Sequence, residues 1–419
     1  MKKLKIILLI FNMPFYLFAQ LWEYKGLGTY DINSLYISND TIYAGTGMNQ
    51  ASILYRSPNL GLSWDSITAV NVDNINIPSI ISHEGSLFFG THRNGLFRST
   101  DNGISWELKD NGLPQEFAAD VFAVSNNNYL IAAGSSGSSP GCIFWTNDNG
   151  ENWSRISSGI PIEEQTSVLD IEINNAGHIY ALADSWSGIK IWYSSNNAAI
   201  WYEISKPQSS ANIGIGSLDL DSLGNLYFSS DDKIYFSSDN GTIWTPLFTF
   251  PAPVVKIKLN KKTGVMYVVA GDSIYSSGNG VNWINISNGL PANFTPRPTE
   301  QYLKMDFDLS NNVYLGTRAG VYKLPFPATS STEIREKYLY FSFYPNPSNG
   351  EITISNLPGK NSFILNIYNL LGENCYNTII DPIENRSLNL TGLTKGAYLL
   401  SLTNKEYRLR GRLLISTKE

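Results

Sequence analysis

The chain has 419 residues, of which 16% are charged and 13% are aromatic, and its formal net charge is −6. This acidic balance argues against nucleic acid and anionic surfaces as partners, because binding of phosphates needs concentrated Lys and Arg. After residue 25 we find no sustained apolar periodicity of a helix, and Gly, Asn and Ser are plentiful. The composition therefore predicts an all-β protein of short strands and turns.

The first 19 residues differ from the rest. Lys2, Lys3 and Lys5 precede an apolar run over residues 6–18, and the small residue Ala19 follows it. This order is typical of a secretory signal peptide and is too short for a membrane span. We therefore expect a secreted or cell-surface protein without a transmembrane segment.

An octapeptide recurs six times behind the signal. Its copies are SPNLGLSW (57–64), STDNGISW (99–106), TNDNGENW (146–153), SSNNAAIW (194–201), SSDNGTIW (237–244) and SSGNGVNW (276–283). The closing tryptophans are 39 to 48 residues apart. A repeat of this length, holding four short strands, is typical of a β-propeller blade.

A seventh unit begins at Tyr302 and holds only three strands. The segment 21–27, in which Trp22 takes the place of the repeat tryptophan, is expected to supply the fourth. Pairing the first strand with the last blade closes the ring and removes its open edges. The prediction for residues 20–327 is a seven-bladed propeller.

The octapeptide lies in the hairpin between the third and fourth strands of each blade. Its acid or Asn accepts hydrogen bonds from turn amides, its glycine takes a positive φ, and its Trp packs against the sheet. These structural positions are Asn59, Gly61, Trp64, Asp101, Gly103, Trp106, Asp148, Gly150, Trp153, Asp239, Gly241, Trp244 and Trp283. Ala198 replaces the glycine in blade 4 and Gly278 the acid in blade 6, so altered turns are expected there.

The pattern S-x-D-x-G-x-x-W resembles the Asp-box, or bacterial neuraminidase (BNR), repeat. Similar families include sialidases, sortilin-type receptors, xyloglucan-cleaving glycosidases and photosystem assembly factors. The resemblance implies a propeller whose boxes lie on the face opposite the active site. Because the fold serves enzymes and non-enzymes alike, it does not select a function.

Residues 328–340 form a Ser/Thr-rich linker, and residues 341–419 a second domain of short strands. This domain resembles the type A C-terminal sorting domain of the bacterial type IX secretion system, which implies a small Ig-like β-sandwich that carries the protein across the outer membrane. An ordinary adhesive Ig-like domain is the alternative. The matching positions are Pro345, Asn346, Pro347, Gly350, Gly372, Gly396 and Tyr398.

Three side chains in the loops between second and third strands are candidates for ligand binding. Trp186 has no place in the repeat and is suited to stack on a sugar or another flat ligand. Arg93 and Arg318 lie in equivalent loops of blades 2 and 7 and are suited to an anionic group, although solvated loop arginines are the simpler interpretation.

The first strands of several blades carry charged residues close to the propeller axis. A glycosidase needs two carboxylates facing each other across a cleft. Inter-blade ion pairs explain the same pattern more simply, because buried charges are normally paired. The acids are Asp170, Glu172, Asp219, Asp221, Asp306 and Asp308, and the neighbouring bases are Lys256, Lys258 and Lys304.

The function that these patterns favour is a monomeric binding and scaffold module without catalytic residues, metal or cofactor. Its expected partners are the type IX secretion machinery and a glycan or protein on the propeller face that carries the loops named above. A carbohydrate-active hydrolase and a protein-recognition platform remain the alternatives. Cys142 and Cys375 lie in different domains, so two free buried thiols are expected rather than a disulfide.

Overall fold

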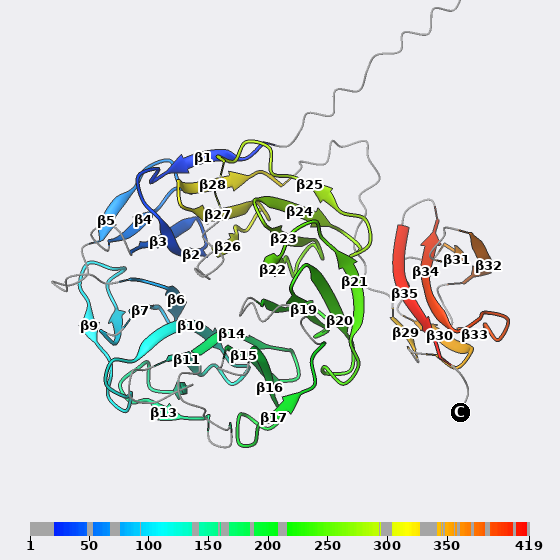
Figure 1. Ribbon diagram of the computed structural model, residues 1–419, viewed down its shortest axis with the longest axis horizontal. Coiled ribbons are helices and arrows are strands. Elements are labelled where there is room, and N and C mark those ends of the chain that lie inside the picture. The colour runs from blue at the N-terminus through cyan, green and yellow to red at the C-terminus, as the bar shows by residue number, and fades with distance from the viewer. Residues whose placement is uncertain are drawn as a thin grey trace, which may run out of the picture. The chain divides into compact units, whose positions relative to one another are not determined.

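Figure 1 shows the computed structural model of the chain. The structure describes residues 21–47, 53–67, 76–92, 94–135, 142–157, 160, 167–184, 188–207, 216–292, 294, 304–326, 342–344, 346, 348–355, 357, 361–369, 373–381, 386–404 and 408–416. The expected signal peptide lies outside these ranges. The chain divides into two compact units, Met1–Phe326 and Pro327–Glu419.

The described residues of the first unit form seven four-stranded antiparallel sheets, called blades 1 to 7. Blades 1 to 4 are β2 (Ile32–Ser38), β3 (Thr41–Thr46), β4 (Leu54–Ser57) and β5 (Asp65–Ile67); β6 (Ser79–His83), β7 (Ser86–Gly90), β8 (Leu96–Ser99) and β9 (Glu107–Leu108); β10 (Ala118–Val124), β11 (Leu130–Ser135), β12 (Cys142–Thr146) and β13 (Ser154–Arg155); and β14 (Ser167–Ile173), β15 (Ile179–Asp184), β16 (Lys190–Ser194) and β17 (Tyr202–Ile204).

The remaining blades follow the same order of strands, apart from the last. They are β18 (Leu218–Leu220), β19 (Leu226–Ser230), β20 (Lys233–Ser237) and β21 (Thr245–Thr249); β22 (Val254–Leu259), β23 (Met266–Ala270), β24 (Ser273–Ser277) and β25 (Ile284–Asn285); and β26 (Lys304–Phe307), β27 (Val313–Thr317) and β28 (Gly320–Leu324) with β1 (Glu23–Gly26).

The first strand of the chain completes the last blade. Strand β1 pairs antiparallel with β28, with Glu23 opposite Lys323. Figure 1 shows the sheets arranged around one axis, with first strands such as β2, β6 and β22 innermost and β5, β9 and β25 at the rim. The pairing of β1 with β28 joins the two ends of the propeller sequence.

The apolar core lies between the blades. Seven buried clusters each combine side chains of two neighbouring blades. Between blades 2 and 3, for example, Phe88, Phe144 and Trp153 belong to one cluster. Burial of side chains of this size contributes roughly 1.5–3 kcal/mol each, so every sheet depends on both neighbours.

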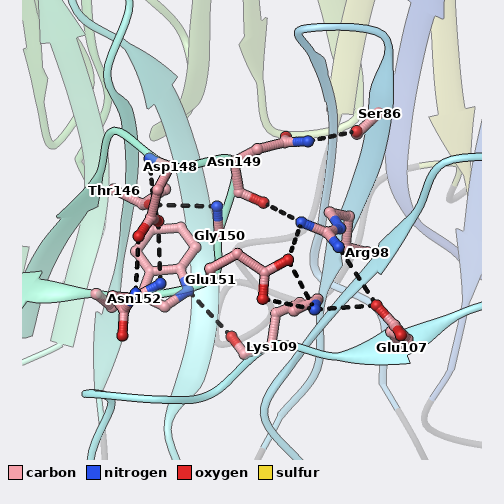
Figure 2. A network of polar contacts seen from close by, with 11 residues as sticks. Ser86, Arg98, Glu107, Lys109, Thr146, Asp148, Asn149, Gly150, Glu151 and Asn152 are labelled. Carbon is pink, nitrogen blue, oxygen red and sulfur yellow. Dashed lines mark hydrogen bonds and ion pairs between the residues drawn. The ribbon is translucent and has the colours of Figure 1, made fainter.

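The octapeptide turns share one set of hydrogen bonds. In blade 2 the Asp101 Oδ1 atom accepts from the Ser99 hydroxyl (2.7 Å) and the Ser105 amide (2.8 Å), and the Ser99 Oγ atom accepts from the Gly103 amide (2.8 Å). Figure 2 includes the equivalent turn of blade 3, around Asp148. Asn59 of blade 1 forms the same bonds with its amide oxygen. The acid therefore builds a turn.

The expectation of an altered turn in blade 4 is wrong. Ala198 adopts a φ of 64°, and its amide donates to the Ser194 hydroxyl oxygen as the glycine amides do elsewhere. In blade 6 the turn does change, because Asn279 rather than Gly278 supplies the acceptor and bonds the Ser277 hydroxyl. The serine and the acceptor are thereby moved by one residue, while the amides of Gly280 and Asn282 donate as their equivalents do in the other turns.

The repeat tryptophans join neighbouring blades. The Trp153 Nε1 atom donates to the Lys109 carbonyl, which directly follows the outer strand of the preceding blade (3.0 Å). Equivalent bonds to the preceding blade, of 2.7 to 2.9 Å, are donated by Trp22, Trp64, Trp201 and Trp244. Trp106 and Trp283 instead donate to a carbonyl of their own turn.

The second unit holds one three-stranded and one four-stranded sheet among its described residues. The strands are β29 (Ser342–Tyr344), β30 (Glu351–Ser355) and β33 (Arg386–Asn389), and β32 (Asn374–Ile380), β31 (Phe363–Tyr368), β34 (Gly396–Thr403) and β35 (Arg408–Ile415). Phe363, Leu400 and Ile352 are among the side chains of its separate core.

Several residues of the predicted sorting signal can be placed. Tyr398 is buried and its hydroxyl donates to the Thr394 carbonyl (2.8 Å), while Gly350 adopts a φ of 108° that favours glycine. Gly396 begins β34, and Asn346 is described, whereas Pro345, Pro347 and Gly372 lie outside the described residues. Cys375 is a free thiol, but it is exposed rather than buried as expected, because it lies on the outward face of β32.

The tryptophan bonds between blades make a testable contribution to stability. Trp153→Phe removes the donor to the Lys109 carbonyl and leaves space in a buried cluster, so we expect the free energy of unfolding to fall by about 2 kcal/mol. Trp106→Phe is the control, because its indole bonds its own turn. Denaturant unfolding of both variants measures the difference, and equal losses would contradict the inter-blade role.

The carboxylate of the turn in blade 2 is replaceable by an amide. Hydrogen bonds from the Ser105 side chain, the Ser105 backbone and the Ser99 side chain lower the pKa of Asp101 to about 2. Its stabilisation is present above the ordinary pKa of 3.8 and is lost as the pH falls through about 2.

We expect Asp101→Asn to unfold at nearly the same temperature as the unmodified protein at neutral pH, because Asn59 forms these bonds in blade 1. Between about pH 4 and 2 it should lose less stability. Asp101→Ala should lower the unfolding temperature by a few degrees throughout. Thermal unfolding over this pH range checks both, and a large loss in Asp101→Asn at neutral pH would show that the charge itself is needed.

Candidate functional site: the inner-strand charge cluster

Charged side chains gather on the innermost strands of blades 3 to 7. We call the set the inner-strand cluster; its members are Asp120, Asp170, Glu172, Asp219, Lys256, Lys258, Lys304, Asp306 and, just after β22, Lys261. Residues two apart on a strand share a face, which explains why Asp170 and Glu172 lie together on β14. The apolar residues between them, such as Ile171, are buried.

Two of the three ion pairs of the cluster join blades that are not adjacent. Lys256 of blade 6 lies 2.8 Å from Asp170 of blade 4, and Lys261 lies 3.1 Å from Glu172, also of blade 4. Lys258 lies 3.9 Å from Asp219 of blade 5. The inner strands of blades 4 and 6 are therefore linked past the intervening blade.

Two aspartates of the cluster accept backbone hydrogen bonds from the next blade. Asp219 accepts from the Leu259 amide at 2.8 Å, and Asp306 accepts from the Ile37 amide at 2.7 Å. The innermost strand of a blade has an unpaired edge whose amides need acceptors. These carboxylates satisfy such amides and join blade 5 to blade 6 and blade 7 to blade 1.

Burial and neighbouring charges separate the pKa values of Asp170 and Glu172. Burial raises the pKa of Asp170, but the charge and hydrogen bond of Lys256 outweigh it, and the net shift is downward. Burial, reinforced by the charge of Asp219, raises the pKa of Glu172 to about 7. Lys261 opposes this shift weakly because its side chain is 45% exposed.

Asp120 and Lys304 form a second perturbed pair. Burial raises the pKa of Asp120 to about 7, and burial together with the charge of Lys256 lowers the pKa of Lys304 to about 8. Asp120 lies at a register shift between β10 and β11, where one extra residue disturbs the ladder. In the part of the chain that the structure describes, its Oδ1 atom is buried without a hydrogen-bond partner.

Asp221 and Asp308 do not belong to the cluster. Each begins a turn after its strand: Asp221 accepts from the Leu223 and Asn225 amides, and Asp308 from the Asn312 amide and side chain. These two acids therefore shape the turn that leads to the second strand, and not the inter-blade ion pairs that the sequence favoured.

The structure places one of the three predicted ligand-binding residues. Arg318 is half-buried in the turn between β27 and β28. Trp186 and Arg93 lie outside the described residues, so the structure does not bring the three together. Within the described ranges, no group of His, Cys, Asp or Glu side chains is arranged to hold a metal ion, and no helix is long and apolar enough to span a membrane.

Sequence reasoning missed two features. Lys261 was not recognised as the partner of Glu172, because its position in a turn gave no periodic signal. Arg56 and Arg98, which directly precede the octapeptide serines of blades 1 and 2, were also missed. An Arg-Ser dipeptide at this point of two repeats was the available signal.

Two family models match the chain. A DUF6242 β-propeller domain matches residues 27–251, and a secretion system C-terminal sorting domain matches residues 342–416. The chain belongs to the family of the DUF6242 β-propeller domain. Its sorting domain implies export by the type IX secretion system to the cell surface or the extracellular space. No curated protein matches the sequence.

Solved structures share the fold at low sequence identity. PorZ, an essential surface component of the type IX secretion system of Porphyromonas gingivalis, has 16% identity over 94% of this chain and a TM-score of 0.54; the match spans 60% of PorZ. YCF48 bound to a D1 peptide has 18% identity over 73% of this chain and 95% of its own, with a TM-score of 0.54. The GH74 xyloglucanase of Xanthomonas campestris has 14% identity over 92% and 73% of the two chains, with a TM-score of 0.53.

The raised pKa of Glu172 predicts a pH-dependent cost to the fold. Below the ordinary pKa of 4.5 the Glu172 carboxyl is protonated in both the folded and the unfolded chain, so its burial does not reduce stability. As the pH rises from there through about 7, the unfolded chain loses this proton more readily than the folded one, and the folded state loses stability. Glu172→Gln should therefore raise the free energy of unfolding by roughly 2–3 kcal/mol at about pH 8 and change it little at about pH 5.

Denaturant unfolding at the two pH values measures this effect. Glu116→Gln, at an exposed position, is the control and should leave the free energy of unfolding unchanged at both pH values. A destabilisation by Glu172→Gln at about pH 8 would mean that the ion pair with Lys261 dominates instead.

Proposed function

We propose that the exported protein is a binding and scaffold module of the cell surface or extracellular space, without a catalytic role. The observation that carries this proposal is the engagement of four of the five acids of the inner-strand cluster. Asp170 and Glu172 have lysine partners, and Asp219 and Asp306 accept backbone amides of the next blade. Carboxylates engaged in this way join blades, which is a structural use of charge.

The ligand surface in this proposal is the propeller face that carries the loops between second and third strands. Arg318 lies in one of these loops, and the sequence positions of Arg93 and Trp186 belong to two others. An arginine pair and an indole suit an anionic glycan or an exposed segment of a partner protein. The D1 peptide bound to YCF48 is an example of a polypeptide ligand on a propeller of this fold.

One observation favours a carbohydrate-active hydrolase as the second candidate. Asp170 and Glu172 have pKa values shifted in opposite directions, with that of Glu172 raised to about 7. Glycosidases use such a pair, in which one carboxyl stays protonated as the acid while the other stays ionised. The ion pair of Asp170 with Lys256 at 2.8 Å argues against this use.

A combined binding and turnover assay separates the two functions. The full exported chain is applied to an array of glycans, and soluble polysaccharides are incubated with it to detect new reducing ends. We expect retention of ligand without new reducing ends. Release of reducing ends that disappears in Glu172→Gln and persists in Glu116→Gln would overturn the proposal and establish the hydrolase.

A further inference from the structure

A small pocket opens between blades 1 and 2, away from the inner-strand cluster. It has a volume of about 170 Å³ and is lined by Arg56, Asp65, Ser66, Ile67, Gly103 and Ile104. Strands β4 and β5 provide its first wall, and the octapeptide turn of blade 2 provides the second. This volume suits one side chain or a ligand of similar size.

The same place between blades 2 and 3 has the same arginine. Arg56 and Arg98 each donate from Nη1 to a carbonyl in the octapeptide turn of the next blade, that of Asn102 at 3.0 Å and that of Asn149 at 2.7 Å. Each also faces an acid on the strand paired with its own, with Asp65 at 3.6 Å from Arg56. The two interfaces are therefore built on one plan.

The interface between blades 2 and 3 is filled by a second carboxylate. Glu151, which follows the turn glycine, lies 2.8 Å from the Arg98 Nη1 atom and 2.9 Å from the Lys109 Nζ atom. Lys109 also pairs with Glu107, which completes a network of four charges. Figure 2 shows Glu151 between the two cations.

The interface between blades 1 and 2 has apolar residues at these positions. Ile104 stands where Glu151 stands in the next turn, and Ile67 stands where Lys109 stands after the next outer strand. Ile104 is 80% exposed, and the Arg56 side chain is 28% exposed, against 10% for Arg98. The pocket is the space that a carboxylate fills at the neighbouring interface.

We infer that this pocket binds a glutamate side chain of a partner polypeptide. Its carboxylate takes the place at Arg56 that Glu151 takes at Arg98, where the guanidinium is a charge-assisted donor. Its two methylenes pack against Ile67 and Ile104, whose aliphatic surface has no counterpart in the charged network of the next interface. This inference goes beyond the proposed binding function, because the pocket lies at an octapeptide turn and not on the loops between second and third strands.

The test uses N-acetylglutamate α-amide as probe and the full exported chain. Ligand-observed NMR titration should show saturable binding with a dissociation constant in the millimolar range, as expected for one ion pair at a partly exposed site. N-acetylglutamine α-amide has the same shape without the charge and should bind at least tenfold more weakly. Equal binding of the two probes, or no binding of the first, would overturn the inference.

Two variants and one control locate the site. Arg56→Gln removes the guanidinium, and Ile104→Glu supplies the missing carboxylate from the chain itself; each should weaken probe binding tenfold or more. Arg98→Gln changes the filled interface and should leave binding intact. Because Ile104 is exposed, its replacement leaves the core intact, and an unfolding curve at or above the stability of the unmodified protein checks this.

Probe binding that survives Ile104→Glu, or that is lost equally in Arg98→Gln, would contradict the assignment. Failure of this test leaves the glycan and turnover assay unaffected, because the pocket and the inner-strand cluster share no residue. Conversely, discovery of hydrolase activity would overturn the proposed function without changing the expected loss of probe binding in Arg56→Gln.

Discussion

The structure of the propeller depends on contacts between blades. A single four-stranded sheet buries apolar side chains only by packing against its neighbours, and each of the seven inter-blade clusters draws on two sheets. In four of the six octapeptides the tryptophan adds a directional bond to this packing, from its indole to a carbonyl of the preceding blade. The short turn before the tryptophan fixes the position of its indole. This explains why the number of residues between the turn and the tryptophan is kept in copies of the octapeptide that lack the acid.

The repeat made the architecture predictable, but it did not predict the conformation of the turns in blades 4 and 6. The left-handed conformation was assigned to glycine, yet Ala198 adopts it with a φ of 64°, because its amide and the neighbouring cluster hold the turn in place. In blade 6 the acceptor moved to Asn279, a change by one residue that octapeptide alignment hides. Hydrogen bonds constrain atoms in space, and more than one sequence register satisfies them.

The sequence predicted which charged residues form the inner-strand cluster, but it did not predict which of them pair with one another. Alternation along the strands indicated that lysines and acids meet near the axis. It did not indicate that Lys256 reaches Asp170 past blade 5, nor that Asp306 accepts a backbone amide of blade 1. These choices depend on side-chain length and on the curvature of the ring, which no local pattern records. The pocket at Arg56 likewise follows from a difference between two blade interfaces, which no single repeat contains.

The pairing of β1 with β28 also has a consequence for folding. Glu23 and Lys323 are opposite one another although about 300 residues separate them in the chain. Contacts of such long sequence separation form late, because the closure entropy of the whole loop must be overcome first. Strand β1 is therefore without its partner until β28 is available, and blade 7 lacks its outer edge until the two strands pair. We therefore expect ring closure to be a late step of folding, and until it occurs the unpaired edge of blade 7 is open to aggregation or to a chaperone.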